Sequence, residues 1–505
     1  MIGHVLRGAS LAALACAVLG ASACASTGGS SEAEPDKARE TLAPGLDASA
    51  NPDPYPSTYR PLPRENMAIV GATVLTGTGA RIENGVVIVT DGRVAAVGDA
   101  STPTPAGHRV VDARGRYVTP GVIDVHSHLG VYPSPGVQGM SDGNEATSPN
   151  TAQVWAEHSI WPQDPGFNTA RAGGVTTLHI LPGSANLFGG RGVTLRNVPS
   201  ITMQGMKMPG APHTVKMACG ENPSRVYGSR NQSPATGMGN VAGYRAAFIA
   251  ARDYKAKWDK WREDGEGSPP TRNLQNETLA GVLDGSILIQ NHCYRADEMA
   301  LMMDLAREFD FRITTFHHAT EAYKLAPQLA EAGICTAIWT GWWGFKMEAL
   351  DGIEENAALV DAAPGGCAVI HSDDAELTQR LNQEAAAALS AGAVAAAEAE
   401  AEPEPESGDD EPASDEAERT KADPAEDAPE GLAADAADAE DAPDAPDAAD
   451  APEASEPTEP DDAVTIELPD DDAPRSLSAD AAGDDPALTR DARTSAAFGA
   501  LAAAM

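Results

Sequence analysis

Two histidines, His126 and His128, stand one residue apart at the end of the apolar run "VTPGVIDVHSHLG". The run is rich in β-branched residues and predicts a strand, in which residues i and i+2 point to the same face. Both imidazoles would then leave the strand end side by side, where neutral imidazole can bind one divalent metal ion. For this motif alone, the commoner alternative is two polar residues at a strand–loop junction.

Four later strand-like runs also end in residues that can bind metals. They are "HTVKMACG" with Lys216, "LIQNHC" with His292, "TTFHHA" with His317 and His318, and "AVIHSDD" with His371, Asp373 and Asp374. Each has a plainer alternative, such as a surface lysine or a hydrogen-bonded core histidine. Neighbours on a strand face opposite ways, so one of His317 and His318 should face away. We expect Asp374 to cap the following helix and Asp373 to do chemistry.

The elements that must position these residues alternate between strands and helices. From 119 to 392, strand-like runs are separated by stretches such as "ADEMALMMDLAREFD", whose apolar residues recur at helical spacing. This alternation predicts an α/β protein with a parallel sheet, and its length suits a (β/α)8 TIM-like barrel. Chemistry in such barrels lies at the carboxyl ends of the strands. Before it, residues 61–118 contain short apolar runs between Gly, Asp-Gly and Pro turns, which predict a small module of antiparallel strands.

The start of the chain predicts export. Residues 1–24 combine a basic start at Arg7, an apolar stretch and small residues, as a secretory signal does. "ASAC" resembles a bacterial lipobox and predicts lipidation of Cys24, with the protein anchored in the periplasm or cell envelope. Membrane contact would then occur only through that lipid. The alternative is plain cleavage near "ASA" and a soluble periplasmic protein, and residues 25–60 are expected to form a flexible linker.

Composition sets further limits. The chain has 505 residues and a formal net charge of −40, so phosphate backbones should repel it and nucleic acid is not an expected partner. Residues 393–505 are rich in Ala, Asp, Glu and Pro, which predicts a disordered acidic tail. The four cysteines after the signal are far apart and lack zinc-ribbon spacing, so we expect buried small hydrophobes rather than disulfides. They are Cys219, Cys293, Cys335 and Cys367.

From about 66 to 392 the chain resembles the metal-dependent amidohydrolase superfamily, in its imidazolonepropionase-like and prolidase-like branch. The resemblance is carried by "VTPGVIDVHSHLG", "GGVTTLHILPGSANLFGGRG", "VKMACGENP", "NHCYRADEM", "FHHATEAYK" and "IHSDD". It implies that His126 and His128 bind the more buried metal and that a carboxylated Lys216 bridges two metals. It also implies that His292 and His318 bind the second metal and that Asp373 is both ligand and proton shuttle. His318 is preferred because "FHHA" resembles the family's Glu-His-Gly, with His317 as the alternative.

These residues predict a hydrolase that cleaves a carbon–nitrogen bond with a metal-activated hydroxide, using one or two divalent ions, zinc by expectation. The substrate would be a small molecule: an amide, a cyclic amide or a small dipeptide. The alternatives are a deacetylase or deaminase of the same superfamily, or an inactive barrel lipoprotein with a binding role. The residues expected to hold a substrate carboxylate, with surface ion pairing as the alternative for each, are Arg191, Tyr227, Arg230 and Arg295.

The resemblance stops after "RLNQEAAAALSAG", where family members continue into the closing strands of the β-module. The acidic tail stands there instead. The β-sandwich-type module is therefore expected to be incomplete and to expose an apolar face. A diverged tail, a partner that supplies the strands and a shifted reading frame are the competing explanations. Separately, a homo-oligomer is an expected form of the protein.

Overall fold

The computed structural model describes only part of the chain, namely residues 42–43, 45–48, 53–265, 267–342, 344–373 and 375–401. The predicted signal sequence with Cys24, the expected cap Asp374 and the acidic tail beyond 401 lie outside the described residues. Among the helices of the described ranges, none has both the length and the apolar character that a membrane span requires.

The N-terminal module is a sheet of five strands in the order β3-β2-β1-β4, with β5 pairing beside β1. The strands are β1 (Met67–Leu75), β2 (Arg81–Thr90), β3 (Arg93–Gly98), β4 (Arg109–Asp112) and β5 (Tyr117–Val118). Asp91 and Gly92 join β2 to β3 with φ angles of 51° and 73°, as a two-residue type I′ hairpin turn requires. The expectation of antiparallel strands throughout is wrong for β4 and β5, which pair parallel with β1.

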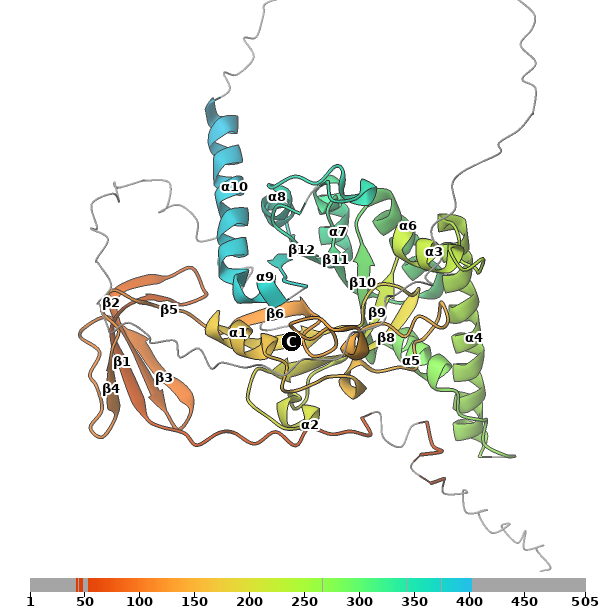
Figure 1. The fold of residues 1–505 in the computed structure, drawn as a ribbon, viewed down its shortest axis with the longest axis horizontal. Coiled ribbons are helices and arrows are strands. Elements are labelled where there is room, and N and C mark those ends of the chain that lie inside the picture. The colour runs from red at the N-terminus through yellow and green to blue at the C-terminus, as the bar shows by residue number, and fades with distance from the viewer. Residues whose placement is uncertain are drawn as a thin grey trace, which may run out of the picture. The chain divides into compact units, whose positions relative to one another are not determined.

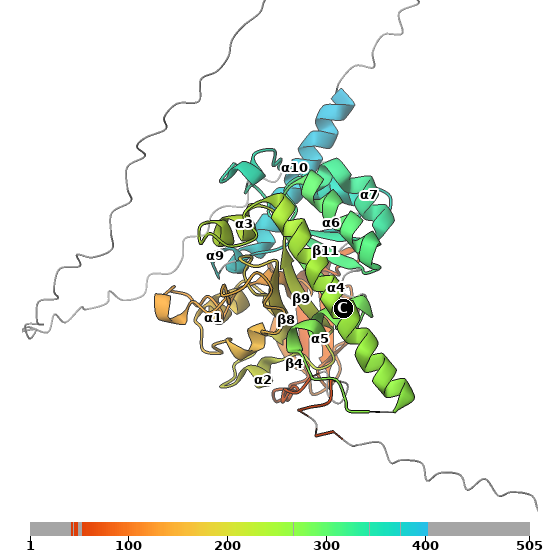
Figure 2. The ribbon, with the colours of Figure 1, turned by 90° about the vertical axis from the view of Figure 1, so that its right-hand side faces the viewer.

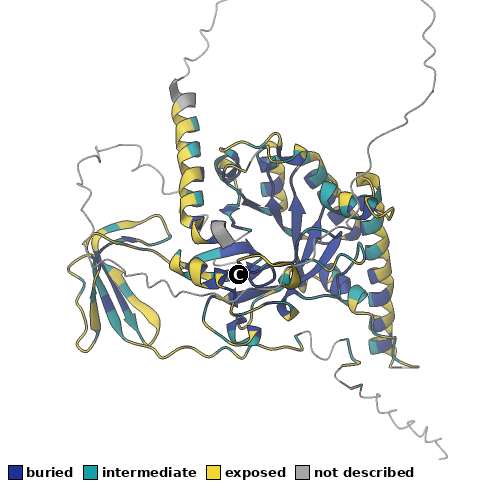
Figure 3. Cartoon of the chain, in the orientation of Figure 1, coloured by how far each residue is buried: buried dark blue, intermediate teal, exposed yellow. Residues whose placement is uncertain are grey.

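Apolar side chains remain exposed on this module. Val94 of β3 is 64% exposed, Val110 of β4 56% and Tyr117 of β5 62%. Figure 3 shows exposed and half-buried residues along most of its strands. These apolar side chains are uncovered among the described residues, and the absence of closing strands stays a prediction.

The second sheet forms a nearly closed barrel of eight strands in sequential order, β6 to β13 (Figure 1). Its strands are β6 (Val122–Ser127), β7 (Val175–Ile180), β8 (Phe188–Arg196), β9 (His213–Ala218), β10 (Ile287–Cys293), β11 (Ile313–His318), β12 (Cys335–Ile338) and β13 (Ala368–Ile370). Asp373 brings the two edge strands together, because its backbone N donates to O of His126 (3.0 Å) and its O accepts from N of His128 (3.1 Å). The predicted α/β fold with a TIM-like barrel is confirmed. One strand departs from the parallel pattern, since β8 runs antiparallel to β7 and β9.

Helices cover the outside of the barrel strands. The α-helices are α1 (Gly166–Ala172), α2 (Met203–Met206), α3 (Glu221–Gly228), α4 (Gly237–Asp264), α5 (Leu274–Leu283), α6 (Ala296–Phe309), α7 (Ala326–Ala332), α8 (Asn356–Ala362), α9 (Ala375–Gln379) and α10 (Leu381–Ala401). Short 3₁₀ helices are η1 (Gln138–Met140), η2 (Ala156–His158), η3 (Ala322–Leu325) and η4 (Met347–Ala349). Figure 2 shows the long α4 running beside α5, where Trp258 and Trp261 pack with Ala280.

The main core lies between these helices and one face of the strands. Val215 and Met217 of β9 and Phe316 of β11 belong to this core, together with Met302 and Leu305 of α6. Because strand residues alternate between faces, Lys216 and His317 point to the barrel interior. The apolar side chains of α6 therefore pack on the outer face of the strands. The inner face of the same strands carries the polar residues.

The prediction about the cysteines is wrong. The structure joins Cys219 to Cys293 and Cys335 to Cys367, with Cα–Cα distances of 5.3 and 4.7 Å. Each pair belongs to the ends of two neighbouring strands, β9 with β10 and β12 with β13. Parallel pairing brings residues 74 and 32 positions apart into disulfide range, which spacing along the sequence could not reveal.

Two predicted boundaries also change. The described part of the expected linker 25–60 makes defined contacts, because Nζ of Lys207 donates to Oδ1 of Asp53 (2.7 Å) and to O of Tyr55 (2.9 Å). The expected tail boundary at 393 falls inside α10, which continues to Ala401. The composition of the sequence does not show either difference, because the contacts of Lys207 and the length of α10 depend on the folded structure.

Candidate metal centre

Histidine, lysine and aspartate side chains from five strand ends converge inside the barrel. His126 belongs to β6, Lys216 to β9 and His292 to β10, while His318 ends β11 and Asp373 follows β13. The four basic side chains are at most 3% exposed. The strand order places residues that span about half of the sequence around one point, as expected for a barrel rim.

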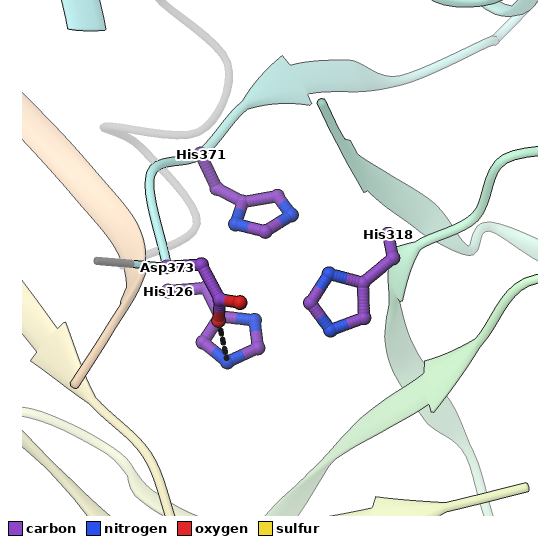
Figure 4. Close-up of side chains that lie close together, drawn as sticks. All are labelled: His126, His318, His371 and Asp373. Carbon is purple, nitrogen blue, oxygen red and sulfur yellow. Dashed lines mark ion pairs between the residues drawn. The ribbon is translucent and has the colours of Figure 1, made fainter. Parts of the chain in front are cut away.

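Three of these groups form, together with His371, a compact set that could hold a metal ion. One donor atom from each of His126, His318, His371 and Asp373 lies within 4.8 Å of the others. Figure 4 shows the three imidazoles and the carboxylate facing a common space. Oδ1 of Asp373 lies 3.4 Å from Nε2 of His126 and 3.1 Å from Nε2 of His128. A mixed imidazole and carboxylate set of this kind suits zinc and similar divalent ions.

His128 is oriented by the backbone of the neighbouring strand. Its Nδ1 lies 2.8 Å from O of Leu181, the residue after β7. A carbonyl oxygen can only accept, so we assign the ring proton to Nδ1. The opposite nitrogen, Nε2, lies 3.1 Å from Oδ1 of Asp373 and faces the centre of the cluster, where it could bind a metal ion after losing any proton it shares with Asp373.

Lys216 is buried against His126. Its Nζ lies 3.0 Å from Nε2 of that ring and donates to O of Pro182 at 3.1 Å. Burial lowers the pKa of Lys216 to about 7. A lysine in this state is partly uncharged near neutral pH, so its amine can react as a nucleophile.

The buried imidazoles are neutral, which is the form of histidine that binds a metal cation. Burial, followed by the charge of Lys216, holds the pKa of His126 and His292 well below the ordinary value. Both ring nitrogens of His292, and Nδ1 of His126 and His318, have no hydrogen-bond partner in the described part of the chain. Buried polar atoms without partners are rare and call for an explanation. Neutral imidazoles with free lone pairs would be satisfied by binding a metal ion in the cluster.

Asp373 carries the negative charge of the cluster. Burial would raise the pKa of this carboxyl group, but the charge and hydrogen bond of His128 outweigh it, and the pKa lies below its ordinary value. The group is therefore ionised across the neutral range. An anion beside neutral imidazoles completes a donor set for a divalent cation.

The expectation that one of His317 and His318 faces away is wrong. Their ring centroids lie 4.7 and 5.0 Å from that of His126, so both rings reach the cluster. His318 has a φ angle of 69°, which breaks the alternation of β11 and turns its side chain inward. Nε2 of His317 lies 2.7 Å from Oε1 of Gln290, so that nitrogen is occupied. His318, unlike His317, belongs to the set of donors that lie within 4.8 Å of one another, and this favours His318 as the ligand.

Two functional candidates carried too weak a sequence signal to be assigned. His371, which the sequence places at a strand end without assigning it a role, has its ring stacked 5.0 Å from that of His126. Asp124, buried two residues before His126, accepts hydrogen bonds from N of Ser372 (3.2 Å) and from its hydroxyl. This carboxylate ties the segment that carries Asp373 to β6 and so positions the cluster.

The residues expected to hold a substrate carboxylate have their described contacts elsewhere. The buried guanidinium of Arg191 lies 3.7 Å from the ring centroid of Trp155, and Arg191 pairs with the outward-facing Val215. The Arg295 Nε donates to Oδ1 of Asp297 at 2.9 Å, and its side chain is 50% exposed. The contact of Arg295 favours surface ion pairing, the alternative that the sequence left open, whereas Arg191 is buried and packs on Trp155.

Tyr227 and Arg230 hold the loop before α1 instead. The Tyr227 hydroxyl donates to O of Ser148 (2.6 Å) and accepts from Nδ2 of Asn186 (2.8 Å). Burial raises its pKa to about 12, so it stays protonated. Arg230 donates to O of Ala146. Their role as substrate contacts remains a prediction, while their described bonds are structural.

Comparison with known proteins adds the family context. No protein-family model matches the chain. The amidohydrolase tasK of Hapsidospora irregularis is 35% identical over 265 residues, which are 49% of this chain and 26% of the relative, so the chain spans about a quarter of that protein. A 5-methylthioadenosine/S-adenosylhomocysteine deaminase of Symbiobacterium thermophilum is 33% identical over 123 residues, 22% of this chain and 28% of the relative. The crystal structure of an amidohydrolase from Thermotoga maritima is 33% identical, covers 65% of this chain and 84% of its own, and has a TM-score of 0.60.

Proposed function

The chain belongs to the amidohydrolase family, and on that basis we propose that it is a metal-dependent hydrolase that cleaves a carbon–nitrogen bond of an amide, a cyclic amide or a small dipeptide. The observation that carries the proposal is the convergence of His126, His318, His371 and Asp373 within 4.8 Å. His128, His292 and Lys216 surround this set and complete the proposed metal site. Zinc is the proposed ion because nitrogen donors dominate.

A bound divalent cation would supply Lewis acidity, which polarises a carbonyl and lowers the pKa of water. The protein's own residues supply the rest. Asp373 is ionised and can take a proton from the attacking water and pass it to the leaving nitrogen. The Asp124 carboxylate, bonded to Ser372, keeps this base in place.

Deamination within the same superfamily is the second candidate, favoured by the partial match to a deaminase. It uses the same water attack and proton transfer, but its leaving group is ammonia from a ring carbon. An inactive barrel lipoprotein is the third candidate. It would keep the fold while binding no metal.

We also propose that the protein is exported and anchored by lipid on Cys24. The two disulfides support an oxidising compartment, because stable disulfides are rare where glutathione keeps thiols reduced. The partners proposed are a small-molecule substrate and a second copy of the chain. The acidic charge continues to argue against nucleic acid.

The test is a screen of dipeptides, N-acyl amino acids, cyclic amides and amino-purines with the zinc-loaded full chain. We expect turnover of an amide or dipeptide, and a fall in kcat of about 10²- to 10⁴-fold for Asp373→Asn. Asp351→Asn, at an exposed ion pair with Lys324, is the matched control and should keep full activity. Equal turnover by Asp373→Asn would show that this residue does not transfer the proton. A folded protein that binds no zinc would favour the inactive barrel.

A further inference from the structure

A row of aromatic rings leads from the candidate metal centre to the protein surface. The Trp339 ring lies 4.1 Å from the ring of His318, measured between centroids. Trp342 lies 5.1 Å from Trp339, and Phe345 lies 5.8 Å from Trp342. Trp342 is 39% exposed and Phe345 50%, whereas His318 is buried. We call Trp339, Trp342 and Phe345 the aromatic row.

Tyr294 borders the row from another strand. It follows β10, and its ring stacks on that of His318 at 5.3 Å and lies 6.1 Å from Phe345. Burial raises the pKa of its hydroxyl, so the group stays neutral. The metal-facing end of the row is therefore enclosed by aromatic surface from the ends of β10 and β12. Such surfaces hold apolar groups well because the rings are large and rigid.

The charges beside the row disfavour an acidic ligand. Lys346 follows Phe345, and its Nζ lies 3.9 Å from the Tyr294 ring centroid. The same Nζ lies 3.2 Å from Oε2 of Glu348 and 3.4 Å from Oε1 of Glu221, so two carboxylates neutralise this ammonium. Within the described residues around the row, no cation is left to pair with a substrate carboxylate. The arginines once expected to do so have their described contacts elsewhere.

Resting on the proposed function, we infer that the aromatic row binds a bulky uncharged group of the substrate, next to the bond that is cleaved. Large exposed aromatic side chains gather at functional sites because their exposure is otherwise unfavourable. The row begins on a ring of the metal centre, so a group seated on Trp342 belongs to a molecule that reaches the cluster. The substrate class is therefore amides with an aromatic or large aliphatic side chain, rather than acidic N-acyl amino acids.

The test compares three ligands that share the same N-acetyl and carboxamide groups and differ in one side chain: N-acetyl-phenylalaninamide, N-acetyl-alaninamide and N-acetyl-glutamic acid 1-amide. Binding to the full chain is measured by calorimetry, and hydrolysis by product analysis. We expect the phenylalanine ligand to bind about tenfold or more tightly than the alanine ligand. Trp342→Ala and Phe345→Ala should each reduce that ratio to within about threefold. Trp161→Ala is the matched control, because Trp161 is 36% exposed and outside the row, and it should keep the wild-type ratio.

The outcomes separate this inference from the proposed function. A wild-type ratio near one, an unchanged ratio in Trp342→Ala, or tightest binding of the glutamate ligand would overturn the inference. Hydrolysis with no side-chain preference would leave the proposed function standing and the inference refuted. Selective binding that Trp342→Ala abolishes, without hydrolysis of any amide, would support the row as a binding site and count against the proposed reaction.

Discussion

Nζ of Lys216 and Nε2 of His126 lie 3.0 Å apart, and both side chains are fully buried. A cationic lysine at this place would repel a metal ion that the imidazoles attract. As a carbamate, the same side chain would present anionic oxygens to the cluster. The chemical state of Lys216 therefore decides whether the centre can hold a second ion.

We expect Lys216 to be carboxylated when carbon dioxide is present. Burial lowers its pKa to about 7, so a large fraction of the amine is neutral at pH 8 and can attack carbon dioxide. Reconstitution with zinc should reach two equivalents with bicarbonate and fewer without it, as measured by elemental analysis. Labelled bicarbonate should give a carbamate carbon signal in the NMR spectrum.

The control for this experiment is a second buried lysine. Lys207 is ion-paired with Asp53 and Glu157, each at 2.7 Å, and lies outside the histidine cluster. Lys216→Met should abolish the bicarbonate dependence, whereas Lys207→Met should keep it. Two zinc equivalents in Lys216→Met would show that this lysine is not the bridging group.

The two neighbouring histidines of β11 should differ in metal binding. His318 belongs to the set of donors within 4.8 Å, while Nε2 of His317 is occupied by Gln290. His318→Ala should therefore weaken zinc binding by about 100-fold or more, and His317→Ala by less than about tenfold. Competition with a chromogenic chelator measures both constants. The reverse order would make His317 the ligand and His318 a support for Trp339.

The convergence of these residues could be predicted because it depends on strand order alone. His126, Lys216, His292 and Asp373 each follow an apolar run of β-branched residues, and a barrel brings such strand ends to one rim. The choice within "FHHA" could not be made from alternation, since it depends on the positive φ of His318. Backbone turns of this kind at a non-glycine residue have no marker in a single sequence.

Features that depend on which strands pair with each other could not be predicted from the sequence. The disulfide partners Cys219 and Cys293 meet only because β9 pairs with β10, and their spacing of 74 residues gives no hint of it. The antiparallel β8 is not apparent from the sequence, because glycine, which is depleted in strands, fills three of the first five positions in its "FGGRG". The position of Arg191 follows from that strand, which turns its side chain toward Trp155.

Reduction of the Cys219–Cys293 disulfide should loosen the metal centre. The bond joins the ends of the two strands that carry Lys216 and His292, so losing it frees these side chains to separate. We expect Cys219→Ala with Cys293→Ala to lose about 2 to 4 kcal/mol of unfolding free energy and to bind zinc more weakly. Urea unfolding and chelator competition measure the two effects.

The Cys335–Cys367 disulfide is the matched control for that experiment. It joins β12 to the start of β13, and neither cysteine adjoins a proposed ligand. Cys335→Ala with Cys367→Ala should cost similar stability and leave zinc affinity unchanged. An equal loss of affinity in both double variants would mean that general stability, rather than the link between β9 and β10, sets metal binding.

Glu298 should make the barrel less stable as the pH rises. Burial, followed by the charge of Glu348, raises the pKa of this α6 carboxyl group from 4.5 to about 7. Between about pH 4.5 and 7, this carboxyl group therefore keeps its proton in the folded chain and loses it in the unfolded chain. The stabilisation is complete below about pH 4.5 and is lost as the pH rises through about 7.

The size of the effect follows from the same pKa difference. A shift of this size sets an upper limit of about 3 kcal/mol, and partial solvation of the carboxylate reduces it to about 1 to 2 kcal/mol. Glu298→Gln keeps the shape without the charge, so it should gain stability relative to wild type at pH 8 and little at pH 4. Glu308→Gln, at a surface ion pair with Arg245, is the control and should show no such gain. Urea midpoints at the two pH values measure the difference, and parallel curves for wild type and Glu298→Gln would show that the group titrates normally.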